Sequence, residues 1–365
     1  MTLMINAQQV ADVLPMRDCV DAMEEAFAEE ARGIAVSHPR QRYRVPRTPD
    51  PGQPAYLANM IAGAVPSRGV AALRYDSMLA HERIVDGVKR RDFVHPSGRS
   101  YGFVILFSLK TGEPLAILQD FTMSSIRVGA TTAVAVRRLA RRSAASVGLF
   151  GSGNEARRNL EAICLVRPIE RVVVFSPSVE HRETFAKEMS AELGVSVRPA
   201  SEPRSVVERA DIIMCATNSS QPVFDGRSLV PGQTVVTIVN SDVVLRKSEA
   251  DEETFLRADL IVLNSRETAV SNQQRELLDL IETGKFGWDK VAELGRVLTG
   301  EQPGRTSDEQ IVYYKNNAGM GIQFAVAGAL VYDECKRRGI GHEVQTEWFG
   351  ADVSEWLAKG FSPSP

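Results

Sequence analysis

The stretch that most constrains the fold of this chain is residues 146–178, SVGLFGSGNEARRNLEAICLVRPIERVVVFSPS. It begins with an apolar run that ends in the hexapeptide GSGNEA, and apolar residues then recur at helical spacing until Pro168. A second apolar run, RVVVF, comes next. A strand, a tight turn, a helix and a strand within about thirty residues predict one βαβ unit, in which two parallel strands are joined by a crossover helix.

The hexapeptide has the spacing of a dinucleotide-binding turn. Gly151 permits a sharp turn, Gly153 lets backbone N–H groups approach a diphosphate, and Ala156 allows close packing of the helix on the sheet. The positive end of the helix dipole then faces the phosphates. The alternative is a glycine-rich turn without a ligand. The residues expected to bind the cofactor here are Gly151, Ser152, Gly153, Asn154, Glu155 and Ala156.

The residues after the second strand bear on the choice between the two nicotinamide cofactors. An NAD enzyme often has an acidic residue at this point for the ribose 2′-hydroxyl, and this strand ends without one. Ser176, Ser178 and Arg182 are suited to a 2′-phosphate, which favours NADP(H) over NAD(H). The alternative is that both serines cap the next helix, and Glu180 keeps NAD(H) possible.

Beyond residue 178, apolar runs alternate with helical patterns, which predicts a parallel, doubly wound sheet. Helices are expected at residues 179–193 and 204–210, and strands at residues 195–198, 211–216, 234–239 and 260–263, the last strong one. Polar residues follow two of these strands, as Thr217-Asn218 and Asn240-Ser241-Asp242. Ligands of such sheets bind beyond the carboxyl ends of the strands, so we expect Thr217 and Asn218 beside the cofactor.

The N-terminal part has a different pattern, typical of a mostly antiparallel sheet behind one helix. A helix is expected between Pro15 and Gly33, strands at residues 56–64 and 69–75, and a hairpin from residues 102–109 and 114–118. Residues 79–100 are charged and irregular, and Ser124-Ser125 are expected to cap a helix at residues 126–139. Near the end, a polar glycine turn at residues 313–321 opens a helix at residues 322–338. The predicted fold class is therefore α/β: a Rossmann-type doubly wound parallel sheet plus a second α+β domain with a mostly antiparallel sheet.

Composition excludes several classes of protein. The net charge of −3 and the pI of about 6.1 give no reason to expect nucleic acid or an anionic membrane as a partner. No apolar run approaches ~18 residues, and no signal peptide is recognisable. The four cysteines form no CxxC pair, so a reducing cytoplasm is the expected location. The five histidines lack metal-ligand spacing, so we expect no metal, and the absence of Ser/His/Asp or Cys/His signatures argues against hydrolysis.

The order of these segments resembles that of the ornithine cyclodeaminase/mu-crystallin family over nearly the whole chain. The similar segments are PAYLANMIAGA, FTMSSIRVGATTAVAVRRLA, GSGNEA, DIIMCATNSSQPVF, PGQTVVTIVNSD and NNAGMGIQFAVAGALVYDE. The resemblance implies two domains, a nicotinamide cofactor, a small amino or imino acid substrate, and a homodimer whose N-terminal sheets meet. Residues 1–125 and 318–365 would then form the substrate-binding and dimerisation domain, and residues 126–317 the dinucleotide-binding domain.

By position, Arg42 and Arg127 resemble the arginines of the family that hold the substrate carboxylate, and Asp242 resembles its acid/base carboxylate. For Arg42 the alternative is a surface charge on a strand. For Arg127 it is a cofactor phosphate contact or a salt bridge between domains, and for Asp242 it is a helix cap or a turn. Nearby, Arg40, Arg44 and Arg47 are expected on a solvated strand edge.

Two positions depart from the family pattern. Arg74 stands where cyclodeaminases usually have a lysine, and Phe324 stands where many members have an aspartate. An ion pair of Arg74 with Asp76 or Glu82 is as well supported as a role in substrate binding or catalysis. Because an arginine stays protonated, it cannot shuttle protons as a lysine does. This departure disfavours cyclodeamination.

The favoured hypothesis is an oxidoreductase that reduces a small α-imino acid, such as a cyclic ketimine, or oxidises the matching α-amino acid. Hydride moves between the nicotinamide and the C=N carbon, and Asp242 handles the proton. The first alternative is an ornithine or lysine cyclodeaminase that releases ammonia and recycles its cofactor. The second is an NADPH-dependent protein that binds a small ligand, as mu-crystallin does.

Overall fold

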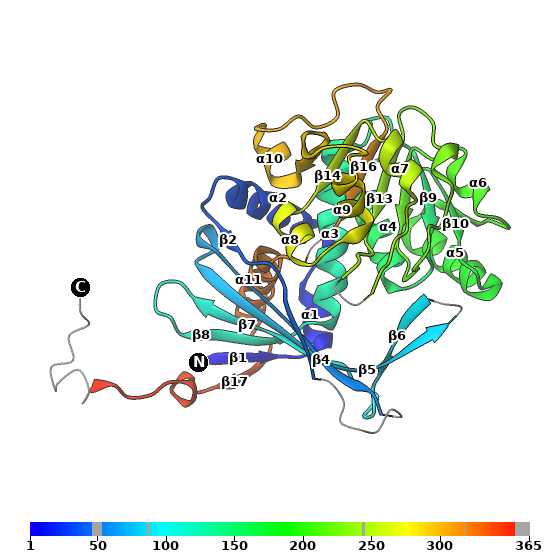
Figure 1. Ribbon diagram of the computed structural model, residues 1–365. Helices are drawn as coiled ribbons and strands as arrows, with labels where there is room; N and C mark the ends of the chain where they lie inside the picture. Colours follow the sequence, from blue (N-terminus) through cyan, green and yellow to red (C-terminus); the bar gives the residue numbers. More distant parts are fainter. Residues whose placement is uncertain (46–52, 86–87, 243–244, 318, 355–365) are drawn as a thin grey trace.

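The computed structural model describes residues 1–45, 53–85, 88–242, 245–317 and 319–354. The chain forms two lobes, each built on one sheet (Figure 1). Arg47, expected on a strand edge, lies outside the described residues. None of the described helices combines the length and the apolarity needed to cross a bilayer.

The larger part of the second lobe is a parallel sheet of eight strands in the order β11-β10-β9-β12-β13-β16-β14-β15. The order reverses at β9, where the chain moves first toward β10 and β11 and then returns to β12 on the other side. The strands are β9 (Ser146–Phe150), β10 (Arg171–Phe175), β11 (Ser196–Pro199), β12 (Ile212–Cys215), β13 (Thr234–Thr237), β14 (Leu260–Leu263), β15 (Val291–Glu293) and β16 (Val312–Lys315). This confirms the predicted doubly wound sheet and places a topological switch at β9.

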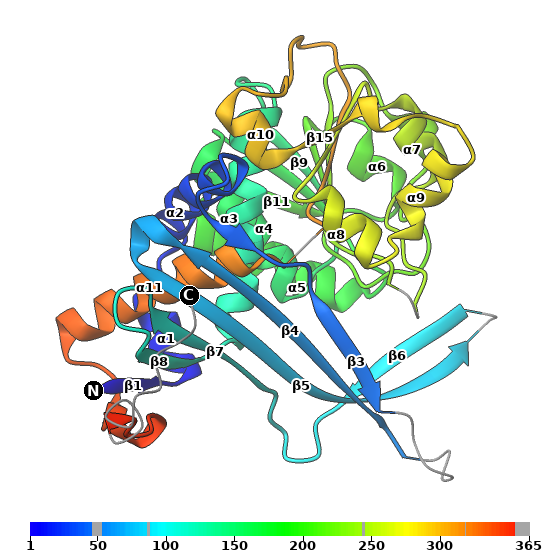
Figure 2. The same ribbon diagram turned by 60° about the vertical axis from the view of Figure 1, so that its left-hand side comes forward.

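Helices cover both faces of this sheet (Figures 1 and 2). They are α4 (Asn154–Val166), α5 (Val179–Leu193), α6 (Arg204–Val207), α7 (Glu252–Arg257), α8 (Arg266–Ser271), α9 (Arg275–Glu282) and α10 (Leu294–Thr299). Short 3-10 helices lie at Pro66–Arg68, Gly226–Ser228, Trp288–Lys290 and Thr346–Phe349.

Two strands of the parallel sheet, β15 and β16, were not expected. The sequence predicts a polar turn at residues 313–321, whereas β16 runs through its first residues and lies between β13 and β14. Tyr314 and Lys315 are fully buried there because distant residues satisfy their polar atoms, among them Asn264 and Glu276. A YYK segment therefore forms a central strand although its local pattern is polar.

The first lobe is a nine-stranded, mostly antiparallel sheet. Its main path is β17-β1-β8-β7-β5-β4-β2, with β3 paired to β4 and β6 paired to β5, and only β1 and β8 run parallel. The strands are β1 (Thr2–Ile5), β2 (Val36–Ser37), β3 (Gln41–Val45), β4 (Ala55–Val65), β5 (Val70–Val85), β6 (Val88–Val94), β7 (Tyr101–Ser108), β8 (Pro114–Gln119) and β17 (His342–Val344). The hairpin of β7 and β8 confirms the prediction.

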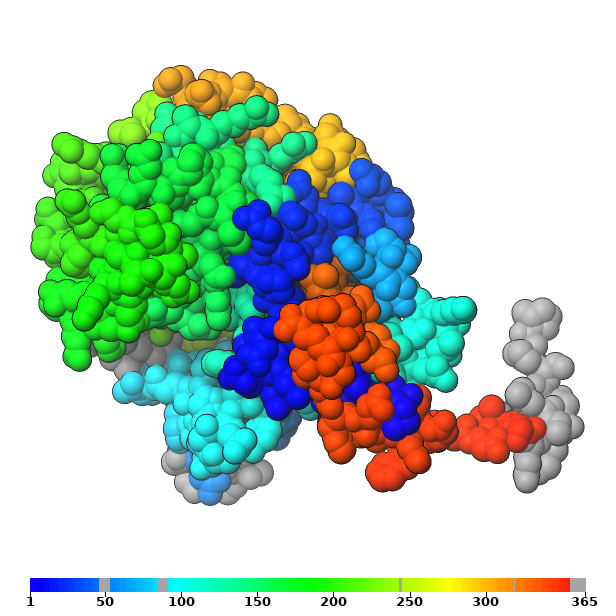
Figure 3. All heavy atoms as spheres, turned by 180° about the vertical axis from the view of Figure 1, so that it is seen from behind, coloured from blue at the N-terminus to red at the C-terminus, as the bar shows by residue number. Residues whose placement is uncertain are grey.

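Helices α1 (Ala7–Val13) and α11 (Gly321–Arg338) pack against this sheet, and α2 (Met16–Ala31) packs against α11. Seen from behind, the blue residues of α1 and α2 lie beside the orange residues of α11 (Figure 3). The start of α11 touches β4 so closely that a Cβ on Gly321 would lie 2.0 Å from the carbonyl oxygen of Ala62, so only glycine fits there. This contact fixes the beginning of α11 beside the strands that carry the expected substrate arginines.

The expectation of irregular structure at residues 79–100 was wrong for residues 79–85 and 88–94, which are strands, whereas residues 95–100 form neither strand nor helix. Strands β5 and β6 form a long hairpin that extends toward the second lobe (Figure 1). Charged and apolar residues are mixed in the sequence of these strands, which therefore lack the alternation that reveals a half-buried strand. Cross-strand ion pairs hold them, one between Arg91 and Glu82 at 3.2 Å and one between Arg83 and Asp92.

Helix α3 (Phe121–Leu139) joins the two lobes. It begins at Phe121, five residues before the expected start, and its N-cap is Asp120 rather than Ser124 or Ser125. The expected boundary between domains at residues 125 and 126 falls inside this helix. Helix α3 packs against α2 and α4, and one hydrophobic core runs through both lobes.

Candidate active site

The glycine turn lies at the switch point of the parallel sheet. Gly151 has φ +108°, and a Cβ on it would lie 2.2 Å from the carbonyl oxygen of Ala216, so glycine is required by both backbone and space. Gly153 is the N-cap of α4, and nothing lies within 4 Å of a Cβ placed there. Ala156 is fully buried against the sheet. The amide groups at the start of α4 therefore face open space, as a diphosphate would require.

Glu155 lies in the first turn of α4. Its carboxyl oxygen Oε2 is buried and has no hydrogen-bond partner. Burial raises the pKa of Glu155, and the opposite effect of Arg127 and Arg158 is smaller. Asn154 and Ser152 complete the turn, and Ser152 Oγ donates a hydrogen bond to Ser176 Oγ at 3.0 Å.

The three residues expected to choose the cofactor gather beside this turn at the end of β10. Ser178 caps α5, because its Oγ accepts a hydrogen bond from the backbone N–H of His181 at 3.2 Å. Arg182 donates from Nη1 to the carbonyl oxygen of Ser176 at 2.9 Å and stacks over Phe175. The capping alternative thus describes Ser178, whereas Ser176 and Arg182 lie next to Ser152.

A buried glutamate that the sequence did not reveal organises the ends of β12 and β13. Glu249 accepts hydrogen bonds from both N and Oγ1 of Thr217, at 2.6 and 2.8 Å. Its second oxygen accepts from the backbone N–H groups of Ile238 and Val239, both at 2.9 Å. Burial raises the pKa of Glu249 against the opposing effect of these donors. Asn218, next to Thr217, is exposed.

Asp242 lies at the carboxyl edge of the same sheet, on the loop after β13. Its Oδ1 accepts a hydrogen bond from the N–H of Leu245 at 2.8 Å, so the residue does form the turn expected as an alternative. Its Oδ2 is ion-paired with Arg42 of β3 and lies 3.7 Å from Nη1 of Arg91 of β6. One carboxylate oxygen thus fixes the loop, and the other faces the first lobe.

A buried ion pair supports the loop that carries Asp242. Nζ of Lys315 lies 2.8 Å from Oε1 of Glu276, and both side chains are almost fully buried. Lys315 donates to the carbonyl oxygen of Val239 at 3.1 Å, and Glu276 accepts from the N–H of Ser241 at 3.1 Å. Burial lowers the pKa of Lys315, but Glu276 outweighs this effect and the pKa is raised. The chain just before Asp242 is therefore held on both sides.

Arg42 and Arg74 are each held by an acidic or amide neighbour. Nε of Arg42 donates to Oδ1 of Asn59 at 2.7 Å, in addition to the ion pair with Asp242. Arg74 pairs through Nε with Asp120 at 2.5 Å and through Nη2 with Asp76 at 3.0 Å. The expected alternative of a structural ion pair for Arg74 is thus present with Asp76. Its other predicted partner, Glu82, pairs instead with Arg44 at 3.0 Å and with Arg91.

Arg127 is buried in the second turn of α3. Its Nη1 donates to Oε1 of Gln323 at 3.0 Å, and its Nε has no hydrogen-bond partner among the described residues. Its guanidinium lies 4.9 Å from the ring centre of Phe324, and that of Arg74 lies 5.4 Å from it. Burial and the neighbouring charge of Arg74 lower the pKa of Arg127 to about 10. The phenylalanine supplies packing but no counter-charge.

Arg40 is not on the solvated edge where the sequence placed it. Its Nε is buried without a partner, and a Cβ on Gly319 would lie 2.8 Å from its Nη2 and 3.4 Å from Nη1 of Arg127. Burial, with repulsion from Arg42, Arg74 and Arg127, lowers the pKa of Arg40 to about 9. The signal that would have separated it from Arg42 is Pro39, which ends the alternating frame before β3 begins. Arg44, by contrast, is exposed as expected.

The structure therefore brings the expected residues Arg42, Arg74, Arg127 and Asp242 together between the two lobes, and it adds Arg40 and Arg91. Because β9, β12 and β13 are parallel neighbours, the glycine turn and the Asp242 loop lie at the same edge of the sheet. This edge is where open α/β sheets bind ligands.

Comparison with known proteins agrees with this arrangement. A family profile described as ornithine cyclodeaminase/mu-crystallin family matches residues 1–339. The Δ1-pyrroline-2-carboxylate reductase of Bacillus cereus is 31% identical over 67% of this chain and 74% of its own. The iminosuccinate reductase of Paracoccus denitrificans is 26% identical over 94% of this chain and 99% of its own.

A solved structure of similar fold is that of Thermococcus litoralis Δ1-pyrroline-2-carboxylate reductase in complex with NADH and L-proline. It has a TM-score of 0.81 at 24% identity, and the match covers 94% of this chain and all of the other. The family profile spans both lobes and every residue of the site described above. The chain belongs to the ornithine cyclodeaminase/mu-crystallin family.

Proposed function

We propose that this protein is an NAD(P)-dependent oxidoreductase that reduces a small α-imino acid, cyclic or open, or oxidises the matching α-amino acid. The observation that carries the proposal is the position of Asp242. Its carboxylate stands at the same sheet edge as the glycine turn and faces a group of arginines on the other lobe. Two relatives bear the names of reductases that act on imino acids, and one solved relative binds NADH.

The residues of the chain fit the group that this reaction needs. The open space over Gly153 and the free amides at the start of α4 suit a dinucleotide diphosphate. A bound nicotinamide would donate or accept the hydride at the substrate carbon. Arg127 and Arg42 are assigned to the substrate carboxylate, since a guanidinium can hold a carboxylate with two parallel hydrogen bonds. Arg74, anchored by Asp76 and Asp120, keeps a fixed positive charge beside them.

Asp242 is assigned to the proton at the substrate nitrogen. In the reductive direction the nitrogen gains a proton as the C=N bond becomes a C–N bond, and in the oxidative direction it loses one. Arg42 pairs with the carboxylate of Asp242 and orients this carboxylate toward the substrate nitrogen. The turn with Leu245 and the buried pair of Lys315 and Glu276 hold the loop in place.

The cyclodeaminase alternative is disfavoured by the environment of Arg74. Two carboxylates hold this side chain, and an arginine remains protonated. A lysine at that position would exchange protons with the substrate, and Arg74 does not. A non-enzymatic binding protein would have no use for an acid/base carboxylate at the position of Asp242.

We further propose NADP(H) as the preferred cofactor. Ser176 bonds to Ser152 of the glycine turn, Arg182 bonds to Ser176, and β10 ends without an acidic residue; among the described residues, Arg182 donates a hydrogen bond through Nη1 alone. The bound NADH of the Thermococcus relative is the reason to test both cofactors.

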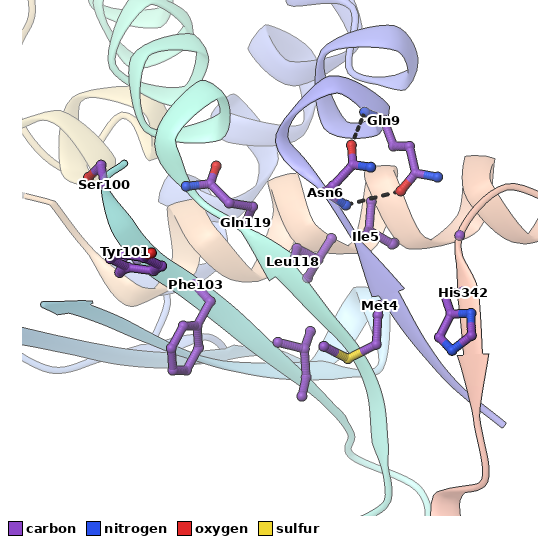
Figure 4. Close-up of a pocket in the computed structure, with 13 residues that line it drawn as sticks. Met4, Ile5, Asn6, Gln9, Ser100, Tyr101, Phe103, Leu118, Gln119 and His342 are labelled. Atoms are coloured by element: carbon purple, nitrogen blue, oxygen red, sulfur yellow. Dashed lines mark hydrogen bonds between the residues drawn. The ribbon is translucent and has the colours of Figure 1, made fainter. Parts of the chain in front are cut away.

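A homodimer is proposed from the outer face of the N-terminal sheet. This face carries partly exposed apolar side chains, including Met4, Tyr101 and Phe103. Figure 4 shows the hollow among them, a cavity of about 530 Å³ that reaches Gln119 and His342. Apolar patches of this kind mark protein interfaces. Light scattering after gel filtration tests the dimer, and a Phe103→Glu variant is expected to be monomeric.

The experiment that tests the enzymatic proposal is oxidation of NADPH and NADH with a panel of cyclic ketimines and of 2-oxo acids plus an amine. Turnover of at least one imine without release of ammonia is the expected result. Protein that binds the cofactor but turns over no member of the panel would refute the proposal.

A further inference from the structure

Within the described part of the chain, two of the arginines at the site form no ion pair with an acidic residue. Among the described residues, Arg42 pairs with Asp242, Arg74 with Asp76 and Asp120, and both Arg44 and Arg91 with Glu82. Arg40 and Arg127 make no such ion pair, and the Nε atom of each is buried without a hydrogen-bond partner. These two side chains are therefore the ones available to an anionic ligand.

The guanidinium groups of Arg40 and Arg127 both lie beside Gly319. Both approach Gly319 just before α11, with Nη2 of Arg40 and Nη1 of Arg127 within 2.8 and 3.4 Å of the position of a Cβ. Buried positive charges without counter-charge are costly, and burial together with repulsion from neighbouring arginines lowers the pKa of both side chains. Glu155 also acts on Arg127, and burial raises the pKa of this carboxyl group, but no ion pair joins the two side chains among the described residues.

A substrate with one carboxylate leaves this charge unbalanced. An α-imino acid protonated at nitrogen carries one negative and one positive charge, so it adds no net negative charge. Three acids of the site, Asp76, Asp120 and Asp242, are already shared with Arg74, Arg42 and Arg91, and Phe324 carries no charge. A second acidic group on the substrate would supply the missing charge.

We propose that Arg40 binds a second acidic group of the substrate, so that the enzyme prefers α-imino and α-amino dicarboxylates to monocarboxylates of the same length. This inference rests on the proposed function and names the substrate class of the same site. Arg127 holds the α-carboxylate and Arg40 the distal one. Arg42, which also pairs with Asp242, stays beside Arg127 at the α-carboxylate, and Arg91 faces Asp242.

The test compares substrates that differ only in the distal group. Oxaloacetate and 2-oxobutyrate each form a four-carbon imine with ammonia. The imine of oxaloacetate ends in a carboxylate and that of 2-oxobutyrate in a methyl group. Both are assayed with NADPH and with NADH. Each imine takes up one hydride and one proton to give the amino acid. Rates without ammonia are subtracted. The kcat/KM is expected to be at least about tenfold higher for the diacid, because the free energy of one charge-assisted hydrogen bond corresponds to a factor of about ten.

The variant Arg40→Gln is expected to lower the diacid to monoacid ratio of kcat/KM by about 10- to 100-fold. Arg40→Lys keeps the charge and should restore part of the ratio. The matched control is Arg44→Gln, on the same segment but exposed, which should leave the ratio within about twofold. A wild-type enzyme without preference for the diacid, or an Arg40→Gln variant that loses both activities equally, would overturn the inference.

A binding measurement separates this inference from the proposed function. If no imine is turned over, the proposed function fails, and titration of the cofactor complex with succinate and with butyrate still decides the role of Arg40. Tighter binding of succinate that is lost in Arg40→Gln supports the inference. Equal binding of the two acids by the wild-type protein overturns it.

Discussion

The carboxylate of Asp242, on the loop after β13 of the parallel sheet, is ion-paired with the guanidinium of Arg42 on β3 of the antiparallel sheet. The residue assigned to proton transfer is thus held by the lobe assigned to the substrate. The long hairpin of β5 and β6 brings Arg91 to the same carboxylate. Any motion of one lobe relative to the other would therefore change the surroundings of Asp242.

The first prediction concerns this carboxylate. Asp242→Asn preserves the shape of the side chain but cannot exchange a proton, so kcat should fall roughly 100- to 10,000-fold. Binding of NADPH, measured by fluorescence, should change less than about threefold, because Asp242 is not assigned to the cofactor. The control is Asp225→Asn, an exposed carboxylate of the same lobe. An Asp242→Asn enzyme with wild-type kcat would show that another group moves the proton.

The two glycines of the turn should respond differently to alanine. Gly151→Ala places a Cβ 2.2 Å from a backbone oxygen at φ +108°, which is expected to cost about 1–3 kcal/mol of unfolding free energy. Gly153→Ala meets open space, so its melting temperature should match the wild type. Its affinity for the cofactor should nevertheless fall at least about tenfold, because the methyl group occupies the place of the diphosphate. Unchanged affinity in Gly153→Ala would exclude the diphosphate from this turn.

The preference between cofactors is expected to depend on Arg182. Arg182→Gln should weaken NADPH about tenfold and NADH less than about threefold, since only NADPH carries the 2′-phosphate. Arg171→Gln, at the opposite end of β10, serves as the control. If Arg182→Gln weakens both cofactors equally, the guanidinium does not contact the 2′-phosphate.

The acid dependence of stability should report on Asp211, which ties the starts of β9 and β12 together. Its carboxylate accepts hydrogen bonds from Ser146 Oγ at 2.6 Å and from the N–H of Ala145 at 2.9 Å, and it pairs with Arg141. Burial raises its pKa, but these donors outweigh burial and the pKa lies below the usual 3.8. A lowered acid pKa stabilises the fold above the unfolded-state pKa, and this stabilisation disappears as pH falls through the folded-state pKa.

Asp211→Asn should therefore lower the melting temperature at pH 7, and the difference from the wild type should shrink as the pH falls below 3.8. Thermal unfolding followed by circular dichroism from pH 7 to pH 3 measures it. Asp12→Asn, which replaces an exposed carboxylate, is the control. A difference that stays constant with pH would mean that the charge of Asp211 does not contribute.

Local sequence patterns predicted those parts of the fold whose stability is local. The βαβ unit, α5 and the hairpin of β7 and β8 were found because apolar periodicity and turn residues lie within each segment. Strand β16 and the hairpin of β5 and β6 were missed because their polar side chains depend on partners distant in sequence or across a strand, such as Glu276 for Lys315.

The candidate site shows the same division. The resemblance to the family named Arg42, Arg74, Arg127 and Asp242, which the fold gathers between the lobes. Arg40 was placed on a solvated edge because its spacing matched that of Arg42, and only the packing of α11 against β4 shows that it turns inward. No local pattern distinguishes Glu249, whose four hydrogen-bond donors come from two different strand ends.

The most direct test of the central claim follows the hydride itself. NADPH or NADH carrying deuterium at C4 of the nicotinamide is incubated with the imine that the enzyme reduces fastest, and the amino acid product is analysed by mass spectrometry. The proposed function predicts one deuterium at Cα and one equivalent of oxidised cofactor per product. Product without deuterium, or ammonia released from ornithine with no net oxidation of cofactor, would contradict it.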